Sequence, residues 1–587
     1  MADDDRETYS TFGGRSKRDY YEQQLGTLKG ERGSFDSHWR ELADWISPQR
    51  IRLSPSDRNK GDKRRQNIID STAGFAMRTL QSGLHAGLTS PARPWFKLGT
   101  PDPDLADFGP VKEYLHVATQ RMHAVFSSTN LYNSLPVVYG DLGLIGTAAM
   151  SVIADDRDLF RTFPYPAGSY VLGMDARGRV TVFMREYELT VRQVVQQFGG
   201  MDGGSAVPGR KIEWGGISPS TQALWKNGQH DMAVELVWVV APNPEANSER
   251  LGARYLPFSS CYFERGEDPS KKGGLLRESG FRAFPIMGPR WEIVGEDSYG
   301  RDCPGMISLG DVKQLQIQQK KKAQAIAKII DPPLVGPVAL RSVKTSLLPG
   351  DVTYVDQREG MSGLRSVHEI SLDLSHLVQS EAQTQYRIQR AWYEDLFLML
   401  AQSDMRGGVQ PITAREVAER HEEKLLALGP VLDRTHDELL EPLIDRVFEM
   451  MEAEELLPPA PEELRGVDLK VEFVSIMAQA QKLVGVVGQD RFLQTIMPLA
   501  QVVPAVVRKV NWNQLIDNYA DQLGLDPRII IPSDVAERAE QQAQQAMAAQ
   551  QAMATAKDAA TAAKGVSEIP VGQGDTVLDR VLSGVGA

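Results

Sequence analysis

Cysteine is scarce in this chain, with two residues, Cys261 and Cys303, among 587. Neither lies at a spacing from another cysteine or a histidine that is typical of a zinc site. So few cysteines exclude a disulfide framework and fit a reducing compartment.

Long apolar runs are also missing, since no stretch of eighteen consecutive apolar residues occurs. The sequence therefore predicts no membrane-spanning helix and no membrane partner. The first ten residues, MADDDRETYS, are acidic and polar, which is the opposite of a secretory signal peptide.

Basic residues are fewer than acidic ones, with 65 Lys and Arg against 77 Asp and Glu, so the net charge is −12. A surface that wraps nucleic acid over its whole extent normally carries a basic footprint, so that class of protein is excluded. A local basic patch remains compatible with the composition.

Signatures of catalysis are absent as well. The sequence contains no GxxxxGK[ST] phosphate loop, no HExxH and no GxSxG. Its glycine groups at 13–14 and 199–204 lack the strand before and helix after that a dinucleotide site needs. We therefore predict that the protein is not an enzyme and that it holds no cofactor or metal.

The central part of the chain has the most informative pattern. The segment 309–330 predicts a helix, which Asp331-Pro332-Pro333 ends because proline lacks an amide hydrogen. At about 100° per residue, one side of this helix is apolar and the other is basic. The apolar side holds Val312, Leu315, Ala323, Ile326 and Ile330, and the basic side holds Lys313, Lys320, Lys321 and Lys328.

The segments after this helix complete an unusual plan. Residues 331–371 have the pattern of strands and turns, and a second helix is expected over 374–401. The glycine-rich loop Asp404-Met405-Arg406-Gly407-Gly408 then leads into a third helix from Thr413 to about Met451. Two helices that flank a short segment of strands and turns suit a subunit that projects a stalk better than they suit an enzyme core.

The remaining segments favour an α+β fold that is mainly α. Residues 1–33 are expected to be a flexible arm, and Ser34 is expected to cap a helix that ends at Ile46. In residues 149–300, apolar and polar side chains alternate as they do in β-strands, and Asp175-Ala176-Arg177-Gly178 is expected to form a hairpin turn. Further helices are expected over 70–88, 111–126 and 135–144, a linker at 457–461, a strand at 467–475, and an Ala/Gln-rich helix over 535–564.

Several ordered motifs resemble one known family over residues 35 to 530. They are Trp39, Trp45-Ile46-Ser47-Pro48, Arg65, Ile69-Asp70-Ser71-Thr72, Gly83-Leu84, Gly87 through Phe96, Tyr299-Gly300-Arg301, Pro411 through Val417, Leu428 through Leu432, and Leu440 through Ile444. By these motifs the chain resembles the portal, or head-to-tail connecting, proteins of short-tailed double-stranded DNA bacteriophages.

The resemblance implies a ring of twelve identical subunits at one capsid vertex, assembled in the host cytoplasm and retained in the virion. Double-stranded DNA would pass through the central channel without sequence specificity, packaged by the terminase large subunit and later ejected. Further implied partners are a tail adaptor protein and the major capsid and scaffold proteins.

The resemblance also implies a division of the chain. It comprises an arm (1–33), a wing (34–305), a first stem helix (306–330), a clip (331–371), a second stem helix (372–402), a tunnel loop (403–412), a long wing helix (413–456), a crown (457–535) and a helical tail with a disordered end (536–587). Candidates for contact with DNA are Lys313, Lys320, Lys321, Lys328 and Arg406, and the tunnel loop is centred on Asp404 through Gly408.

Alternatives remain at this point. The chain could be a head-completion or tail adaptor, or an internal head protein, although such adaptors are usually shorter. A nucleic-acid enzyme would need a phosphate loop or clustered carboxylates for metal. The lysines could face solvent or a neighbouring acidic helix instead of DNA, and the glycine-rich loop could be a plain connector.

Overall fold

A computed structural model describes residues 16–57, 67–102, 105, 108–199, 212–266, 274–330, 334–335, 365–366, 375–403, 428–466, 469–474, 515, 542 and 545–558. By their contacts, these residues form two compact units. The first comprises the described residues within 1–96 and 119–457, and the second those within 97–118 and 458–587. The second unit thus takes in 97–118, which the sequence assignment placed with the wing.

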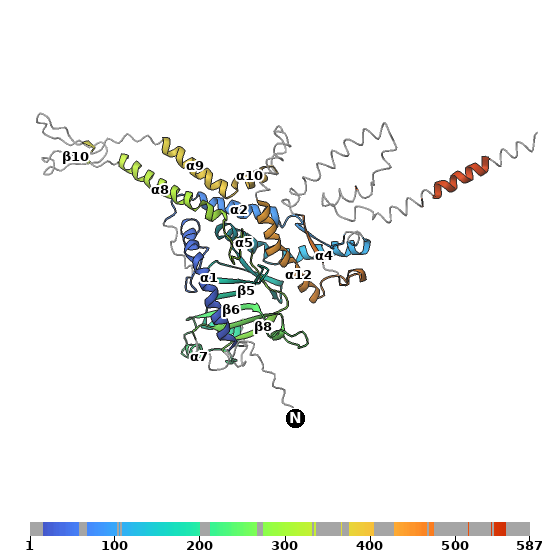
Figure 1. The fold of residues 1–587 in the computed structure, drawn as a ribbon, viewed down its shortest axis with the longest axis horizontal. Helices are drawn as coiled ribbons and strands as arrows, with labels where there is room; N and C mark the ends of the chain where they lie inside the picture. Colours follow the sequence, from blue (N-terminus) through green and yellow to red (C-terminus); the bar gives the residue numbers. More distant parts are fainter. Residues whose placement is uncertain are drawn as a thin grey trace, which may run out of the picture. The chain divides into compact units, whose positions relative to one another are not determined.

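The order of elements follows the chain as Figure 1 labels it. The helices are α1 (Lys17–Trp45), α2 (Thr72–Leu88), α4 (Gly109–Ser128), α5 (Leu131–Ile145), α6 (Val191–Phe198), α7 (Pro219–Lys226), α8 (Pro304–Ile330), α9 (Ser375–Ala391), α10 (Glu394–Ser403) and α12 (Glu441–Ala453). The strands are β1 (Phe96–Gly99), β2 (Ala149–Asp155), β3 (Leu159–Tyr165), β4 (Tyr170–Met174), β5 (Val180–Thr190), β6 (Ala233–Pro242), β7 (Phe258–Glu264), β8 (Arg277–Phe281), β9 (Ile286–Met287), β10 (Leu334–Val335), β11 (Arg365–Ser366) and β12 (Lys470–Phe473).

Two antiparallel sheets form the β-rich part of the first unit, as the alternation over 149–300 predicted. One has the strand order β3-β2-β9 and the other β4-β5-β6-β7-β8. The expected turn between β4 and β5 is present, with Gly178 at a φ of +75° that glycine adopts without steric cost. Among the described residues, no helix combines the length and apolar character that crossing a membrane would require.

Helix α1 corrects the prediction of a flexible arm for residues 17–33. The helix is continuous from Lys17, and its N-cap is Ser16, whose side chain accepts a hydrogen bond from the Asp19 amide; Ser34 is not a cap. Tyr21, Leu25 and Leu28 are buried against the five-stranded sheet. Burial of this apolar face outweighs the unfavourable helix propensity of the glycines that suggested disorder. Figure 1 shows α1 running across β5 and β6.

The second stem helix is also corrected, because 374–401 is not one helix. Helix α9 ends at Ala391 and α10 begins at Glu394, with Tyr393 between them at a φ of +54°. Trp392 is fully buried, and its indole Nε1 donates to Ser308 Oγ at 3.0 Å. Phe397, 5 % exposed, packs against Gly83 of α2. We attribute the break to these two anchors, which a straight helix would not place on their partners.

The expected third helix is described from residue 428 to 453 and contains a π-helical turn at His436–Leu440. Pro442, two residues after this turn, would clash with the carbonyl of residue 438 in a regular α-helix, so the widened turn accommodates it. The turn also points Glu438 at Arg290, which is 2 % exposed and donates from its guanidinium at 2.7 Å. Residues 404–427 lie outside the described part of the chain.

The second unit has fewer described elements. Strands β1 and β12 pair with each other, and Lys97 and Glu472 form an ion pair at 3.6 Å. β12 agrees with the strand expected at 467–475. In the Ala/Gln-rich segment, residues 545–558 are helical and exposed throughout. Their mostly short side chains have little apolar surface to bury.

Candidate functional site

The two stem helices form a hairpin, with α8 and α9 side by side and antiparallel (Figure 1). Three polar contacts join their facing sides: Asp311 with Arg387 at 2.9 Å, Gln318 Nε2 with Ser380 Oγ at 3.2 Å, and Lys322 with Glu381 at 2.6 Å. The Glu381 side chain is only 5 % exposed, so its ion pair is less screened by water and salt than a surface pair. These contacts fix which residues of the two helices lie at the same level.

The base of the hairpin is attached to the segment that precedes α2. Gln316 of α8, 3 % exposed, accepts hydrogen bonds at Oε1 from the backbone amides of Ile69 (2.7 Å) and Asp70 (2.8 Å). Its Nε2 donates to the Asp70 carbonyl at 2.8 Å. From α9, Gln385 donates to the Asp70 carboxylate at 3.1 Å, so one short segment holds both helices.

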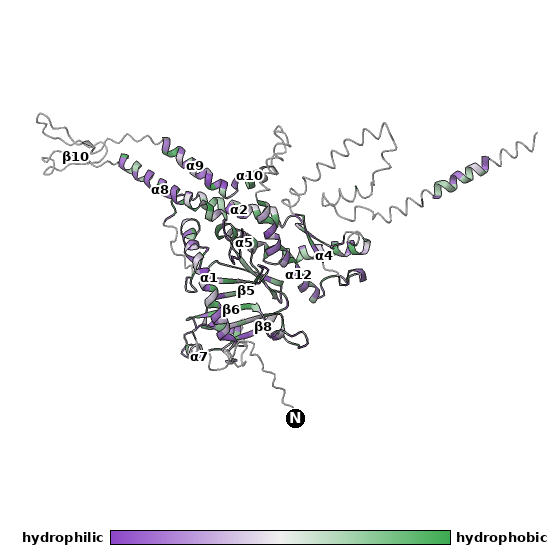
Figure 2. Cartoon of the chain, in the orientation of Figure 1, coloured by the Kyte–Doolittle hydropathy of each residue, from purple (hydrophilic) through white to green (hydrophobic). Residues whose placement is uncertain are grey.

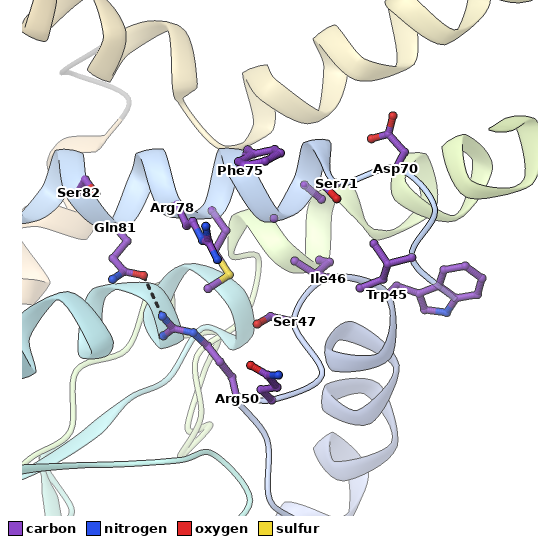
Figure 3. Close-up of a pocket in the computed structure, with 15 residues that line it drawn as sticks. Trp45, Ile46, Ser47, Arg50, Asp70, Ser71, Phe75, Arg78, Gln81 and Ser82 are labelled. Carbon is purple, nitrogen blue, oxygen red and sulfur yellow. Dashed lines mark hydrogen bonds between the residues drawn. The ribbon is translucent and has the colours of Figure 1, made fainter. Parts of the chain in front are cut away.

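A cavity of about 520 Å³ lies beside this attachment, between the end of α1 and α2. Figure 3 shows Arg50 and Arg78 among its lining residues, with Phe75 and Asp70 on the side toward the hairpin. Arg50 is already engaged, because it donates to Asp141 at 2.7 Å and Gln81 at 2.8 Å. Burial raises the pKa of the Asp141 carboxyl although Arg50 opposes the shift. This ion pair therefore has a packing role.

The apolar side expected on the first stem helix is present, but only its first part is covered. Val312 and Leu315 are 0 % and 1 % exposed, whereas Ile326 and Ile330 farther along α8 are 36 % and 77 % exposed. Figure 2 shows hydrophobic and hydrophilic residues mixed along this outer part of α8. Among the residues that the structure describes, nothing covers the outer part of this side.

The predicted lysines fall into two groups. Lys313 forms an ion pair with Glu41 of α1, so it contributes to the attachment of the hairpin. Lys320, Lys321 and Lys328 are exposed on α8 and form no ion pair within the described ranges. Arg406 and the loop Asp404 through Gly408 lie outside the described residues, so the structure does not place them.

The described residues show little that could perform chemistry. No group of three His, Cys, Asp or Glu side chains within the described ranges is arranged to hold a metal ion. Both cysteines are buried, and burial raises the pKa of the Cys303 thiol to about 12, which disfavours the reactive thiolate. The site is therefore best described as a projecting hairpin with its attachment.

Sequence reasoning missed the residues that make this attachment. Gln316 and Gln385 are neutral residues in glutamine-rich helices, and nothing in their spacing distinguishes them from exposed glutamines nearby. Asp70 belongs to one of the family motifs, and its position at the start of the helix predicted over 70–88 is the available signal for a capping role. Its carboxylate does accept from the Thr72 amide at 2.8 Å.

Comparison with known proteins identifies the family of this chain. The model of a family described as bacteriophage head to tail connecting protein matches residues 18–531. The chain belongs to this connector family.

Two curated relatives match nearly the whole connector chain. A portal protein of Salmonella phage epsilon15 is 45 % identical over 532 residues, which cover 90 % of this chain and 92 % of the relative. A probable portal protein of Bordetella phage BPP-1 is 40 % identical over 562 residues, covering 95 % and 96 %. A solved structure of the neck of an empty GTA particle covers 77 % of this chain and 93 % of its own, with 11 % identity and a TM-score of 0.33.

Proposed function

We propose that this protein is the portal subunit of a phage particle. Copies of the chain form a ring at one vertex of the capsid. Double-stranded DNA enters through its channel during packaging and leaves through it during ejection, and the tail is attached to it. The match along more than nine-tenths of two portal relatives supports this function. A short head-completion adaptor would not align over that length.

The observation that carries the proposal is the hairpin of α8 and α9, whose outer apolar side has no partner among the described residues. Ile330, at 77 % exposed, lies where a second copy of the chain could cover it. Large apolar side chains exposed in series on a projecting element typically mark a protein interface. A ring of copies supplies such a partner without any other protein.

The test of assembly uses the purified full-length chain. We expect sedimentation at micromolar concentration and moderate salt to give one large species, and particle images along its axis to show a ring with an open centre. The proposal assigns twelve subunits to this ring. A protein that sediments only as a monomer under these conditions would contradict the proposed function.

The proposal gives the exposed lysines a role at the DNA. Because the chain is acidic, a lining of repeated copies repels phosphate and lets DNA slide, while Lys320, Lys321 and Lys328 add weak contacts at fixed levels. Arg406 and the tunnel loop at 403–412 are assigned to the narrowest point of the channel. In the same arrangement, 331–371 forms the clip toward the terminase large subunit and the tail adaptor, and the crown at 457–535 lies inside the head with the scaffold and major capsid proteins.

Replacing Lys320, Lys321 and Lys328 with glutamine tests this role. We expect rings to form normally, since exposed charges seldom affect stability strongly. DNA retention and the salt dependence of DNA binding are expected to fall, because each lost phosphate contact removes a slope of about 0.9 in log K against log salt. Lys226→Gln with Lys470→Gln, which removes two exposed lysines in other elements, is the control. Full DNA content and normal infectivity of the triple variant would remove these lysines from the mechanism.

A further inference from the structure

Helix α9 carries a second uncovered apolar stripe, formed by Val378, Ala382 and Tyr386. These residues are spaced four apart, so they share one side of the helix. Val378 is 48 % and Tyr386 57 % exposed. We call this side the α9 stripe.

The outer part of α8 carries the matching feature. Ala323, Ile326, Ala327 and Ile330 follow the i, i+3, i+4, i+7 spacing of one helix side, and all four are exposed. Two of them are alanines, whose short side chains let another helix approach closely. We call this side the α8 stripe.

The two stripes lie at overlapping levels of the hairpin. The ion pair of Lys322 with Glu381 aligns the two helices, and Ala323 and Ala382 each follow one residue after a member of that pair. Val378 is one turn from Glu381, and Ile326 is one turn from Lys322. The inner end of the α8 stripe, at Ala323 and Ile326, is therefore level with the outer end of the α9 stripe, at Val378 and Ala382, on an equivalent hairpin beside it.

The stripes nevertheless face different directions. The side of α9 that contacts α8 holds Ser380 and Glu381, and Thr384 lies on the same side. At about 100° per residue, the α9 stripe is centred roughly 160° from Thr384, on the side away from α8. The α8 stripe lies about a quarter turn from the side that contacts α9. The stripes therefore cannot pack on each other within one chain.

We propose that the α8 stripe of one copy packs against the α9 stripe of the next copy around the ring. This inference rests on the proposed function and specifies which faces of the subunit meet. A closed ring with rotational symmetry requires two different faces that fit each other, which two stripes on different sides of one hairpin provide.

Charge favours a second copy over DNA as the occupant of these stripes. Contact with the DNA backbone depends on cations, and the exposed Lys321 and Lys328 lie on a different side of α8 from Ile326. At the level where the stripes overlap, their polar neighbours are Gln319 and Lys320 on α8 and Gln379 on α9, so a cation borders only one of the two stripes. Two such faces meet without repulsion between like charges.

The experiment introduces opposite charges on the two stripes. One variant carries Ala323→Glu with Ile326→Glu, and the other carries Val378→Lys with Ala382→Lys. Each variant alone is expected to lose its rings, because every interface then sets two charges against an apolar face and weakens about tenfold or more. An equimolar mixture is expected to form rings in which the variants alternate. Carboxylates then face lysines at one interface and native stripes meet at the next.

Control variants and the different outcomes of the experiment distinguish failure of this inference from failure of the proposed function. Gln324→Glu and Gln383→Lys each add one charge of the same sign to another side of the two helices and are expected to assemble normally. Rings from either stripe variant alone, or no rings from their mixture, would overturn the inference. If the unmodified chain forms no ring, the proposed function itself is wrong.

A second measurement applies if a charged variant does not fold. The chain with Ala323→Cys and Ala382→Cys retains small side chains, and its two native cysteines are buried. Since the two positions face different sides of one hairpin, oxidation is expected to link neighbouring copies into a ladder on a denaturing gel. Monomer alone after oxidation of assembled rings would overturn the inference.

Discussion

At the scale of single residues, the attachment of the hairpin depends on the neutral side chain of Gln316. It satisfies two backbone amides and one backbone carbonyl of Ile69 and Asp70 while almost fully buried. Buried backbone groups that lose their partners cost free energy, so a residue of this kind affects stability more than its lack of charge suggests.

Gln316→Leu is therefore expected to destabilise the protein by about 2 kcal/mol, because the amides of Ile69 and Asp70 lose their acceptor. Chemical denaturation followed by circular dichroism measures this change in the free energy of unfolding. Gln324→Leu, at an exposed position of the same helix, is the control and is expected to change it by less than about 0.5 kcal/mol. Equal effects of the two substitutions would contradict the proposed importance of the attachment.

Asp445 on α12 gives a pH-dependent prediction. Desolvation by its surroundings, followed by the charges of Glu441 and Glu449, raises the pKa of its carboxyl to about 6. The folded chain then binds this proton more tightly than the unfolded chain, so ionisation of Asp445 destabilises the fold as pH rises through 6.

Asp445→Asn is expected to stabilise the protein by about 0.5 kcal/mol at pH 8, a modest effect because the residue is exposed. The gain is expected to shrink at pH 5, where the native carboxyl is largely protonated. Thermal unfolding at the two pH values measures it, with Glu454→Gln, just past the end of α12, as the control. A gain that is the same at both values would rule out a raised pKa as its cause.

At the scale of secondary structure, helices α1 and α2 show the effect of glycine in two different settings. Gly26, Gly30 and Gly33 have nothing within 4 Å of where a Cβ would lie, whereas a Cβ at Gly83 of α2 would collide with the Phe397 ring of α10. The first three glycines cost helix stability without a packing need in this chain, while Gly83 permits a close contact between helices.

Alanine at Gly26, Gly30 or Gly33 is accordingly expected to raise the free energy of unfolding by about 0.5–1 kcal/mol each, and Gly83→Ala to lower it by about 1–3 kcal/mol. Urea unfolding of the four single variants compares the two settings directly. A stabilising Gly83→Ala would show that α10 does not pack against α2 as described.

Periodicity predicted most of the first stem helix, because α8 is described as far as the expected last residue, Ile330, although it begins at Pro304 and not at Leu309. The expected side with Val312 and Leu315 is the one that is buried. The break between α9 and α10 could not be predicted, since neither glycine nor proline occurs at Trp392 or Tyr393. Its causes are the distant partners Ser308 and Gly83, which local sequence patterns do not reveal. The same holds for the bonds of Gln316.

At the scale of the whole molecule, the Ala/Gln-rich C-terminal segment contrasts with the hairpin. Every described residue from 545 to 558 is exposed, although the segment contains Met547 and Met553. Alanine and glutamine favour a helix without supplying the apolar surface that an interface needs. The hairpin has such surface in both of its stripes.

Deleting residues 536–587 is therefore expected to leave ring formation unchanged, as measured by sedimentation of the truncated chain beside the full-length protein. The truncated ring is expected to have the same number of subunits by native mass spectrometry. Loss of rings on truncation would place the segment within the core assembly.

The anchoring of α8 has a mechanical consequence. From Gln316 to Ile330 the helix extends about 21 Å at 1.5 Å per residue, so a rotation of about 5° at Gln316 moves its far end by about 2 Å. The hydrogen bonds around Asp70 are the point about which the helix would rotate. In a closed assembly, such a rotation repeated in every copy would widen or narrow the passage at that end. Under the proposed function, the width of the channel at that end would then depend on the hydrogen bonds around Asp70.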